Sequence, residues 1–315
     1  MRSPLARAAA LLLCLSGFVS IYFVAVRPWF RAWGADPALR QATLPGDGLV
    51  PNGHPRETRA VVIRAPASVV WPWVAQIGQD RGGFYSFAIL ENLVGCELRN
   101  LDHLEPSLQV WKPGDRLWMY PPEKAGGLGQ APLGLYEPGR ALVFYTRRPG
   151  TRLVDPADGT WAFIVEPLGA RASRFVMRAD GTPSPSLLGA AFESTVFEPI
   201  HFVMERKMME GVKARAEGGH PSAAADAVLV SLWVVTFILF GVSAACVIVG
   251  RDARRRLATF VAAGGLFVFL TLGQPSLRLA IPLVVAVATA TVWPRGRRSA
   301  PRARLARARH GASSG

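Results

Sequence analysis

The sequence predicts an α+β fold, in which an antiparallel sheet is wrapped on a long C-terminal helix and transmembrane α-helices flank the domain. Three observations support this prediction. Uncharged apolar runs lie near both ends of the chain. Between residues 59 and 179, short apolar segments alternate with Gly, Pro and Asp, as strands alternate with turns. A helical stretch from Ser186 to about Glu217 follows, and one long helix is able to cover one face of an antiparallel sheet.

The first apolar run, Ala8 to Val26, contains no charged residue and approaches the roughly 20 residues that a helix needs to cross a bilayer. A cleaved signal peptide would begin in a similar way. The sequence Arg27-Pro28-Trp29 offers no small-residue cleavage site, so we favour an uncleaved anchor over residues 1–33.

Three more apolar runs lie towards the other end: Ala227–Val249, Leu257–Gly273 and Leu279–Trp293. The last two are short, and the helix-breaking segment Gln274–Arg278 joins them, so they either cross the bilayer or form a re-entrant hairpin. An interfacial Trp293 and a snorkelling Arg278 would extend their reach. We therefore favour three transmembrane segments within residues 223–293.

The net charge of +14, from 36 Lys and Arg against 22 Asp and Glu, is not carried by the central domain. Residues 34–222 hold 20 basic and 20 acidic side chains, so the excess belongs to the segments that flank the apolar runs. This distribution is typical of a membrane protein. It argues against a nucleic-acid partner, because that function would need a basic face on the folded domain.

The positive charge also predicts the topology of a multi-pass cell-membrane protein. The basic loop Gly250–Arg256 and the tail Arg295–Arg309 are expected to be cytoplasmic. Four crossings that begin in the cytoplasm also end there, so both termini are predicted to be cytoplasmic and the central domain extracytoplasmic. The Arg-rich tail, residues 294–315, is predicted to be disordered and to lie along anionic lipid.

The central part of the chain begins with Pro- and Gly-rich residues 34–59, which are typical of an extended linker, and residues 60–222 form the predicted domain. Arg59–Ala65 is a β-branched strand. Pro66 begins a helix that runs to Ile77, and Ser86 caps a second short helix that ends near Val94.

Further strands are predicted at Arg116–Tyr120, Ala141–Arg148, Thr160–Glu166 and Ser173–Ala179. The terminal helix places Leu188, Phe192, Val196 and Val203 on one side, and Pro199 kinks its middle.

Several passages of this domain resemble a bacterial branch of the START-like, or SRPBCC, superfamily, whose members include polyketide cyclase/dehydrase and lipid-transport proteins. They are LPGDGLVP (44–51), TRAVVIRAPASVVWPWVAQIGQDRGGFYSF (58–87), LENLVG (90–95), WKPGDRLWM (111–119) and MERKMMEGVKARAE (204–217). The resemblance covers residues 44–217 and implies a helix-grip fold with a hydrophobic ligand cavity. It brings no fixed catalytic residues, and the apolar runs lie outside it.

The stretch QIGQDRGGFYSFAILEN, residues 76–92, places polar side chains among large apolar ones. In a helix-grip fold it would close one mouth of the cavity, with Gly82-Gly83 allowing a sharp turn. The predicted ligand-binding residues are Trp71, Gln76, Arg81, Tyr85, Glu91, Trp118, Tyr120, Phe144, Trp161, Phe163 and Phe192. The alternative is that Arg81 pairs with Glu91 or Asp80 to lock the turn and that the aromatic residues are ordinary core.

Catalytic and metal chemistry have weak support in the sequence. The five histidines show no metal-ligand spacing, and no CxxC or HExxH motif is present, so we expect no metal and no cofactor. Glu91, Asp102 and His103 are the only acid–base candidates that we single out, and a solvated loop is the alternative for the last two. The glycine-rich segment after Lys124 is typical of a mobile loop over a cavity mouth.

The sequence therefore predicts a membrane-anchored binding module that holds a hydrophobic small molecule or lipid beside the bilayer. Two alternatives remain open at this stage. One is an enzyme of the cyclase or dehydratase type that acts on a polyketide-like substrate. The other is a structural platform for a protein partner, with the cavity filled by side chains.

Overall fold

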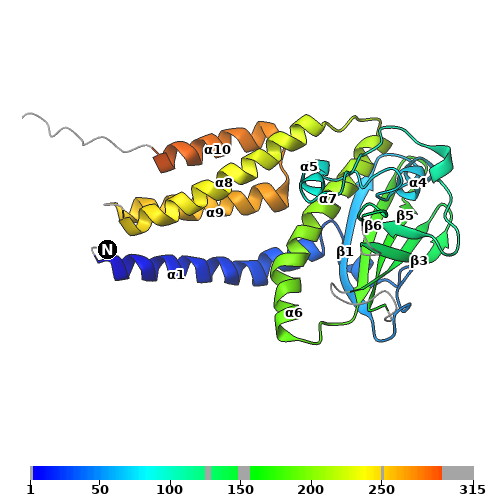
Figure 1. Cartoon of the computed structure of the whole chain (residues 1–315), viewed down its shortest axis with the longest axis horizontal. Helices are drawn as coiled ribbons and strands as arrows, with labels where there is room; N and C mark the ends of the chain where they lie inside the picture. Colours follow the sequence, from blue (N-terminus) through cyan, green and yellow to red (C-terminus); the bar gives the residue numbers. More distant parts are fainter. Residues whose placement is uncertain (1–2, 125–128, 148–156, 250–251, 293–315) are drawn as a thin grey trace, which may run out of the picture.

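The computed structural model describes residues 3–124, 129–147, 157–249 and 252–292. A domain built on one sheet stands at one end of a group of apolar helices (Figure 1). The chain starts at the far end of these helices, enters the domain through the first of them and leaves it through α8, so both connections lie on the same side of the domain. The predicted basic tail and Trp293 lie outside the described residues.

The apolar helices are α1 (Pro4–Ile21), α8 (Ala223–Val249), α9 (Ala253–Gly273) and α10 (Leu277–Val292). A π-helical turn, η1 (Tyr22–Val26), and the short α2 (Arg27–Arg31) continue α1 without a break. In the described part of the chain, three helices are long and apolar enough to cross a membrane: Pro4–Arg31, Ala223–Val249 and Ala253–Gly273. Leu277–Val292 is apolar but shorter, so the predicted fourth crossing stays a prediction.

The sheet has six strands in the order β1-β6-β5-β4-β3-β2, and every neighbouring pair is antiparallel. The fold class is therefore α+β. The strands are β1 (His54–Ile63), β2 (Arg116–Trp118), β3 (Gln130–Glu137), β4 (Ala141–Thr146), β5 (Gly159–Pro167) and β6 (Ser173–Gly181). The sequence did not predict β3, in which Pro132 and Gly134 interrupt the usual strand pattern and the register with β4 shifts.

The two faces of the sheet bury different partners. The inner face carries Phe144, Phe163 and Phe175 against helices α4 (Ala67–Ala75) and α7 (Glu198–Ala216). The outer face carries Val143, Ile164 and Val176 against the segment that contains α3 (Pro37–Gln41). Each strand supplies both faces because successive side chains point to opposite sides.

Residues 34–59 differ from the predicted extended linker. Leu39 and Leu44 are buried on the outer face of the sheet, and β1 begins inside this segment at His54. Arg178 of β6 fixes the segment, because its guanidinium donates to Asp47 over 2.7 Å and to the Ala42 carbonyl over 3.0 Å. The domain therefore has a second, smaller core that the sequence did not predict.

The long terminal helix is confirmed, with an irregular turn where the sequence predicted a kink. Helix α6 (Leu187–Phe192), the π-helical turn η3 (Glu193–Phe197) and α7 follow one another without a break, and Ser186 caps the start by accepting from the Gly189 amide. Pro199 has no amide hydrogen to return to the preceding turn. The Ser194 carbonyl in that turn instead accepts the hydroxyl of Tyr22 from η1.

The domain and the apolar helices share a buried cluster. Phe30 stacks on Phe202 of α7 with ring centroids 5.2 Å apart, and Phe87 meets Trp233 of α8 edge-on at 5.0 Å. Arg206 of α7 donates to the Leu272 carbonyl of α9 over 2.7 Å. These contacts fix the end of the helices against the domain (Figure 1).

Candidate functional site

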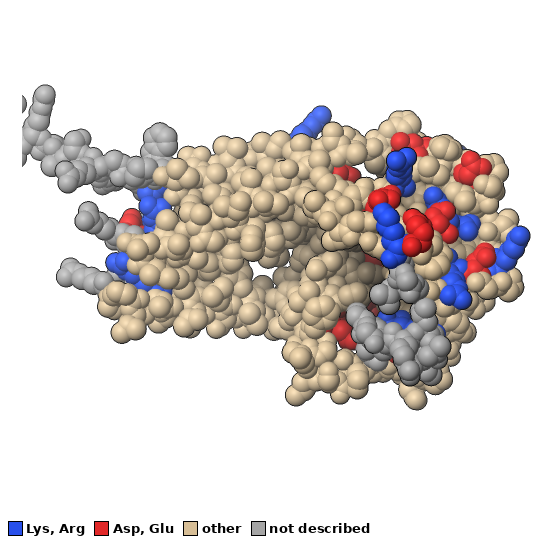
Figure 2. Space-filling model, in the orientation of Figure 1, with Lys and Arg blue, Asp and Glu red and all other residues tan. Residues whose placement is uncertain are grey.

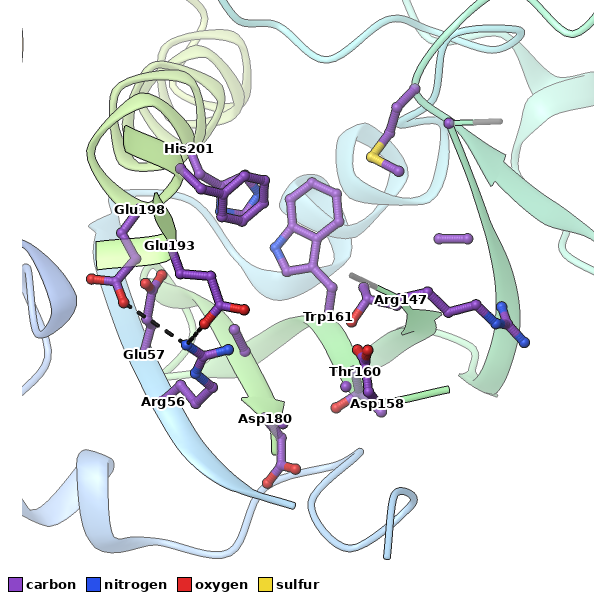
Figure 3. A pocket seen from close by; sticks show the side chains of 18 of the residues that line it. Arg56, Glu57, Arg147, Asp158, Thr160, Trp161, Asp180, Glu193, Glu198 and His201 are labelled. Atoms are coloured by element: carbon purple, nitrogen blue, oxygen red, sulfur yellow. Dashed lines mark hydrogen bonds and ion pairs between the residues drawn. The ribbon is translucent and has the colours of Figure 1, made fainter. Parts of the chain in front are cut away.

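The candidate site is a cavity of about 390 Å³ between the inner face of the sheet and the helical run α6–η3–α7 (Figure 3). The sheet side is formed near the ends of β1, β3, β4, β5 and β6. The helical side is formed by Phe192, Glu193, Phe197, Glu198 and His201, which belong to three consecutive helical segments.

Small residues on the sheet account for the space. Gly159 of β5 and Gly181 of β6 are paired directly, and the next pair on this face is Trp161 with Ala179. Farther along the same strands, Phe163 and Phe175 occupy the corresponding positions and fill the inner core. The cavity therefore lies where the inner face changes from large side chains to glycine and alanine, and Trp161 forms the boundary.

A network of ion pairs lines the helical side of the cavity. Arg56 of β1 lies 2.8 Å from Glu193 and 4.0 Å from Glu198, and the dashed lines of Figure 3 mark these two contacts. Glu198 also receives two hydrogen bonds of 2.7 Å from Arg27. The network therefore joins β1, the helical run and the outer end of the first apolar helix.

A second group of charges lies deeper. The Arg59 guanidinium, which is 1% exposed, is 2.5 Å from a Glu57 carboxylate oxygen and pairs with Glu205. Glu205 also accepts from the indole Nε1 of Trp161 over 2.5 Å. One buried arginine thus compensates two buried carboxylates, an arrangement in which each charge depends on the others.

His201 lies beside this group and lines the cavity, as Glu57 does. Its ring stacks on Phe197 at 5.2 Å and packs beside Trp161 at the same distance, and its Nδ1 is 3.8 Å from Glu205. Burial, together with the positive charge of Arg59, lowers the pKa of His201 to about 3. The imidazole is therefore neutral at neutral pH and able to donate or accept a hydrogen bond in the cavity.

Glu57, His201 and Glu205 could in principle hold a metal ion, because one ligand atom from each lies within 4.8 Å of the others. The ion pairs argue against this use. Arg59 binds both carboxylates, so a divalent cation would have to displace a guanidinium from a site where its charge is already compensated.

Two of the predicted ligand-binding residues, Trp161 and Phe192, line the cavity. Trp71, Phe144 and Phe163 belong to the inner core and do not line it. Trp118 and Tyr120 are half-buried near β2 and also lie outside its lining. Ligand contact by these residues stays a prediction.

Residues 76–92 form a hydrogen-bonded corner away from the cavity lining. Gln76 is fully buried; its amide donates to the Tyr85 hydroxyl over 2.9 Å and to the His103 carbonyl over 3.0 Å. Arg81 lies 4.0 Å above the Trp111 ring and donates to the Leu108 carbonyl. The sequence offered Glu91 or Asp80 as an ion-pair partner for Arg81. In the structure Arg81 instead contacts an aromatic ring and backbone carbonyls.

The predicted acid–base residues also lie outside the cavity lining. Asp102 is exposed and pairs with Arg215 over 3.0 Å, and His103 is exposed beside it. Glu91 accepts a hydrogen bond from Ser86. Burial raises the pKa of Glu91 to about 7, although the Ser86 bond acts in the opposite direction.

The predicted site residues do not include Arg56, Glu57, Glu193, Glu198 or His201, which line the cavity. Arg56 and Glu57 lie in the segment taken as a linker, and the other residues lie on the terminal helix. A signal was nevertheless present: Glu193, Glu198, His201 and Glu205 place four titratable side chains on a helix that also has to cover a sheet.

The chain matches no family model and no curated protein. Solved structures similar to it include one from Thermobifida fusca, with 20% identity over 52% of this chain and 96% of that one, at a TM-score of 0.31. Protein MLL2253 from Mesorhizobium loti shares 11% identity over 52% of this chain and all of its own, at a TM-score of 0.27. The Polyketide_cyc-like protein Cgl2372 from Corynebacterium glutamicum shares 12% identity over 50% of this chain and 87% of its own, at a TM-score of 0.24. At these values the likeness carries no argument about function.

Proposed function

We propose that this chain is a membrane-anchored binding protein that holds a hydrophobic small molecule or lipid. In this proposal the domain is a START-like helix grip, with the sheet and the helical run α6–η3–α7 enclosing the ligand. The observation that carries the proposal is the cavity of about 390 Å³ between these two elements. Glu198, which lines it, is paired with Arg27 of the anchor helix.

The lining suits an amphipathic ligand. Trp161, Phe192, Phe197 and Met119 offer apolar surface for the body of the molecule. Arg56 and the neutral imidazole of His201 offer hydrogen bonds to one polar end. Burying about 300 Å² of ligand surface contributes roughly 7–8 kcal/mol before ordering costs are subtracted.

The charges at the far end of the helices support the topology that we propose, with both termini cytoplasmic and the domain extracytoplasmic. Arg7 donates to the Ile248 carbonyl over 2.8 Å, and Arg256 donates to the Thr291 carbonyl over the same distance. Basic side chains therefore gather at the end of the helices remote from the domain, and in Figure 2 a surface largely without charged residues extends between them and the domain. Basic residues favour the cytoplasmic side.

The experiment that tests the binding function is native mass spectrometry of the full chain, purified from the membrane in mild detergent and then offered lipid extracts. Ala179→Phe fills the cavity opposite Trp161 and should abolish the bound mass. Ala170→Phe, in the exposed turn between β5 and β6, should leave it unchanged. An unmodified chain that binds no added lipid contradicts the proposal.

One observation favours a second candidate, a cyclase or dehydratase acting on a polyketide-like molecule. The cavity contains a neutral imidazole, that of His201, beside several carboxylates, and such a pair is able to move a proton. An enzyme would release or retain a molecule that has lost water, and His201→Gln would retain the intact one. A bound molecule of the same mass in both proteins favours simple binding.

A further inference from the structure

The helical run has an exposed apolar face that the cavity does not use. Leu188, Val196 and Ile200 follow one another at helical spacing and are 83%, 40% and 61% exposed. Leu187, beside them, is 92% exposed, and α6 contains no charged residue. A surface helix normally turns such a face to a core, so this one lacks a partner within the described part of the chain.

The contacts of the neighbouring turn fix the depth of this face relative to the first apolar helix. The Tyr22 hydroxyl donates to the Ser194 carbonyl of η3, and Tyr22 belongs to the uncharged run that ends at Val26. One turn later, Arg27 pairs with Glu198. The face therefore begins where the apolar helix meets its first charge, which is the level of a bilayer surface.

The first apolar helix extends the same kind of surface away from the domain. Val19 and Phe23, near the contact with η3, are 56% and 42% exposed, and Trp29 beyond them is 45% exposed. Aromatic side chains of this kind are typical of the membrane–water interface. In Figure 1, α6 projects from the membrane-proximal side of the domain beyond the edge of the apolar helices.

We infer that α6 and η3 lie in the bilayer surface, with Leu187, Leu188, Val196 and Ile200 in contact with lipid. Phe192 is 49% exposed and also lines the cavity, so the same helix separates the cavity from the lipid. The inference rests on the proposed function in one respect: it makes this helix the side through which the cavity exchanges its ligand with the bilayer. The continuity with the apolar helix favours lipid over a second copy of the chain or a protein partner as the occupant.

The depth of the helix is measurable in the full chain reconstituted in vesicles of phosphatidylcholine and phosphatidylglycerol. Cys14, Cys96 and Cys246 are first replaced, and a nitroxide is then attached at Leu188→Cys. The label should collide with oxygen more often than with a water-soluble nickel complex, as expected about 5–10 Å below the headgroup boundary. A label at Arg140→Cys, in the exposed turn between β3 and β4, should show the opposite preference.

Two results at Leu188 overturn the inference. One is a label as accessible to the nickel complex as the label at Arg140. The other is a label shielded from both reagents and broadened by a neighbouring spin, which would show a second copy on this face.

The route is tested separately, by exchange of bound lipid for deuterated lipid in the vesicles, followed by native mass spectrometry. Leu188→Glu should slow the exchange several-fold, whereas Leu168→Glu, at an exposed leucine after β5, should not. Equal rates in these two variants overturn the route. A Leu188 label in the bilayer together with a cavity that never acquires lipid leaves the docking in place and overturns the proposed function.

Discussion

Arg27, at the outer end of the first apolar helix, binds both carboxylate oxygens of Glu198 through two parallel hydrogen bonds of 2.7 Å. This geometry is the bidentate form in which arginine and carboxylate interact most strongly. The residues are 171 positions apart, so the pair joins the entry of the chain into the domain to the helix that covers its sheet. The Glu198 side chain is 5% exposed and the Arg27 side chain 25%.

Removing Arg27 should therefore destabilise the protein. Arg27→Met removes the bidentate partner of the buried Glu198 and leaves Arg56 at 4.0 Å as the nearest described cation, so we expect a loss of about 3 kcal/mol in the free energy of unfolding. Denaturant unfolding in detergent, followed by tryptophan fluorescence, measures this. Arg140→Ala removes an exposed pair with Glu137 and should cost about 0–1 kcal/mol; equal losses in the two variants would contradict the prediction.

We expect a larger loss of stability when the buried cation shared by Glu57 and Glu205, Arg59, is removed. Arg59→Met would leave Glu57 and Glu205 buried together without their shared cation, and we expect a loss of about 3–5 kcal/mol. Replacing both acids as well, in the triple variant Arg59→Met/Glu57→Gln/Glu205→Gln, should recover most of it. The same unfolding measurement applies, and a triple variant no more stable than Arg59→Met would show that packing rather than charge sets the loss.

The raised pKa of Glu91 should make the free energy of unfolding fall as pH rises. Because the pKa of Glu91 is about 7 in the folded chain and about 4.5 when unfolded, the native state retains a proton between these values that the unfolded state releases. Stability is then lost as pH rises through this window. In denaturant unfolding at a series of pH values, Glu91→Gln should remove this pH dependence and raise the free energy of unfolding at pH 8 by about 2–3 kcal/mol. Glu123→Gln, at an exposed position, should change neither the pH dependence nor the free energy of unfolding at pH 8.

The lowered pKa of His201 should make the free energy of unfolding depend on pH in the opposite direction. Its folded pKa of about 3 lies below the ordinary value of 6.5, so the unfolded state binds a proton first and stability falls as pH drops below 6.5. The side chain is 27% exposed, so water reduces the effect, and we expect about 2 kcal/mol. In unfolding measurements across pH 4 to 7, His201→Gln should lose this fall in stability below pH 6.5, while His220→Gln, in the exposed end after α7, should behave as the unmodified chain.

Gly211 tests the packing of α7 on the corner that contains Tyr85. A Cβ at this position would lie 2.3 Å from the Tyr85 carbonyl oxygen, and Tyr85 is itself held at a φ of 55°. Gly211→Ala should therefore destabilise the protein by about 1–3 kcal/mol in the unfolding measurement, despite the better helix propensity of alanine. Gly241→Ala in α8, where nothing lies within 4 Å, is the matched control and should not destabilise the protein.

The sequence was informative where structure depends on local pattern. The terminal helix followed from apolar spacing, and Pro199 marked its irregular turn. The cap at Ser186 is a finding of the structure. Strand β3 was not predicted, because Pro132 and Gly134 weaken the pattern that identifies a strand. The sheet tolerates both residues because β3 lies near its edge. Residues 34–59 were taken as a linker because Pro and Gly in sequence do not show that Leu39 and Leu44 meet a sheet face.

The position of the cavity could not be predicted from the sequence, for a different reason. Our prediction collected large aromatic residues, but a cavity exists where large residues are missing, here at Gly159, Gly181 and Ala179. Strand alternation left open which face of the sheet each of them occupied. The polar side chains of the site come from β1 and from the terminal helix, which only the fold brings together.

The domain is attached to the apolar helices where the chain enters it and where the chain leaves it, and the Phe30–Phe202 stack belongs to the core that the two share. A domain on one flexible tether is able to swing and to shuttle cargo across an aqueous gap. Two attachments and a shared core forbid that motion. In the proposed membrane setting, any acceptor or donor for the cargo must come to this protein, and the distance between two membranes has to be covered by another carrier.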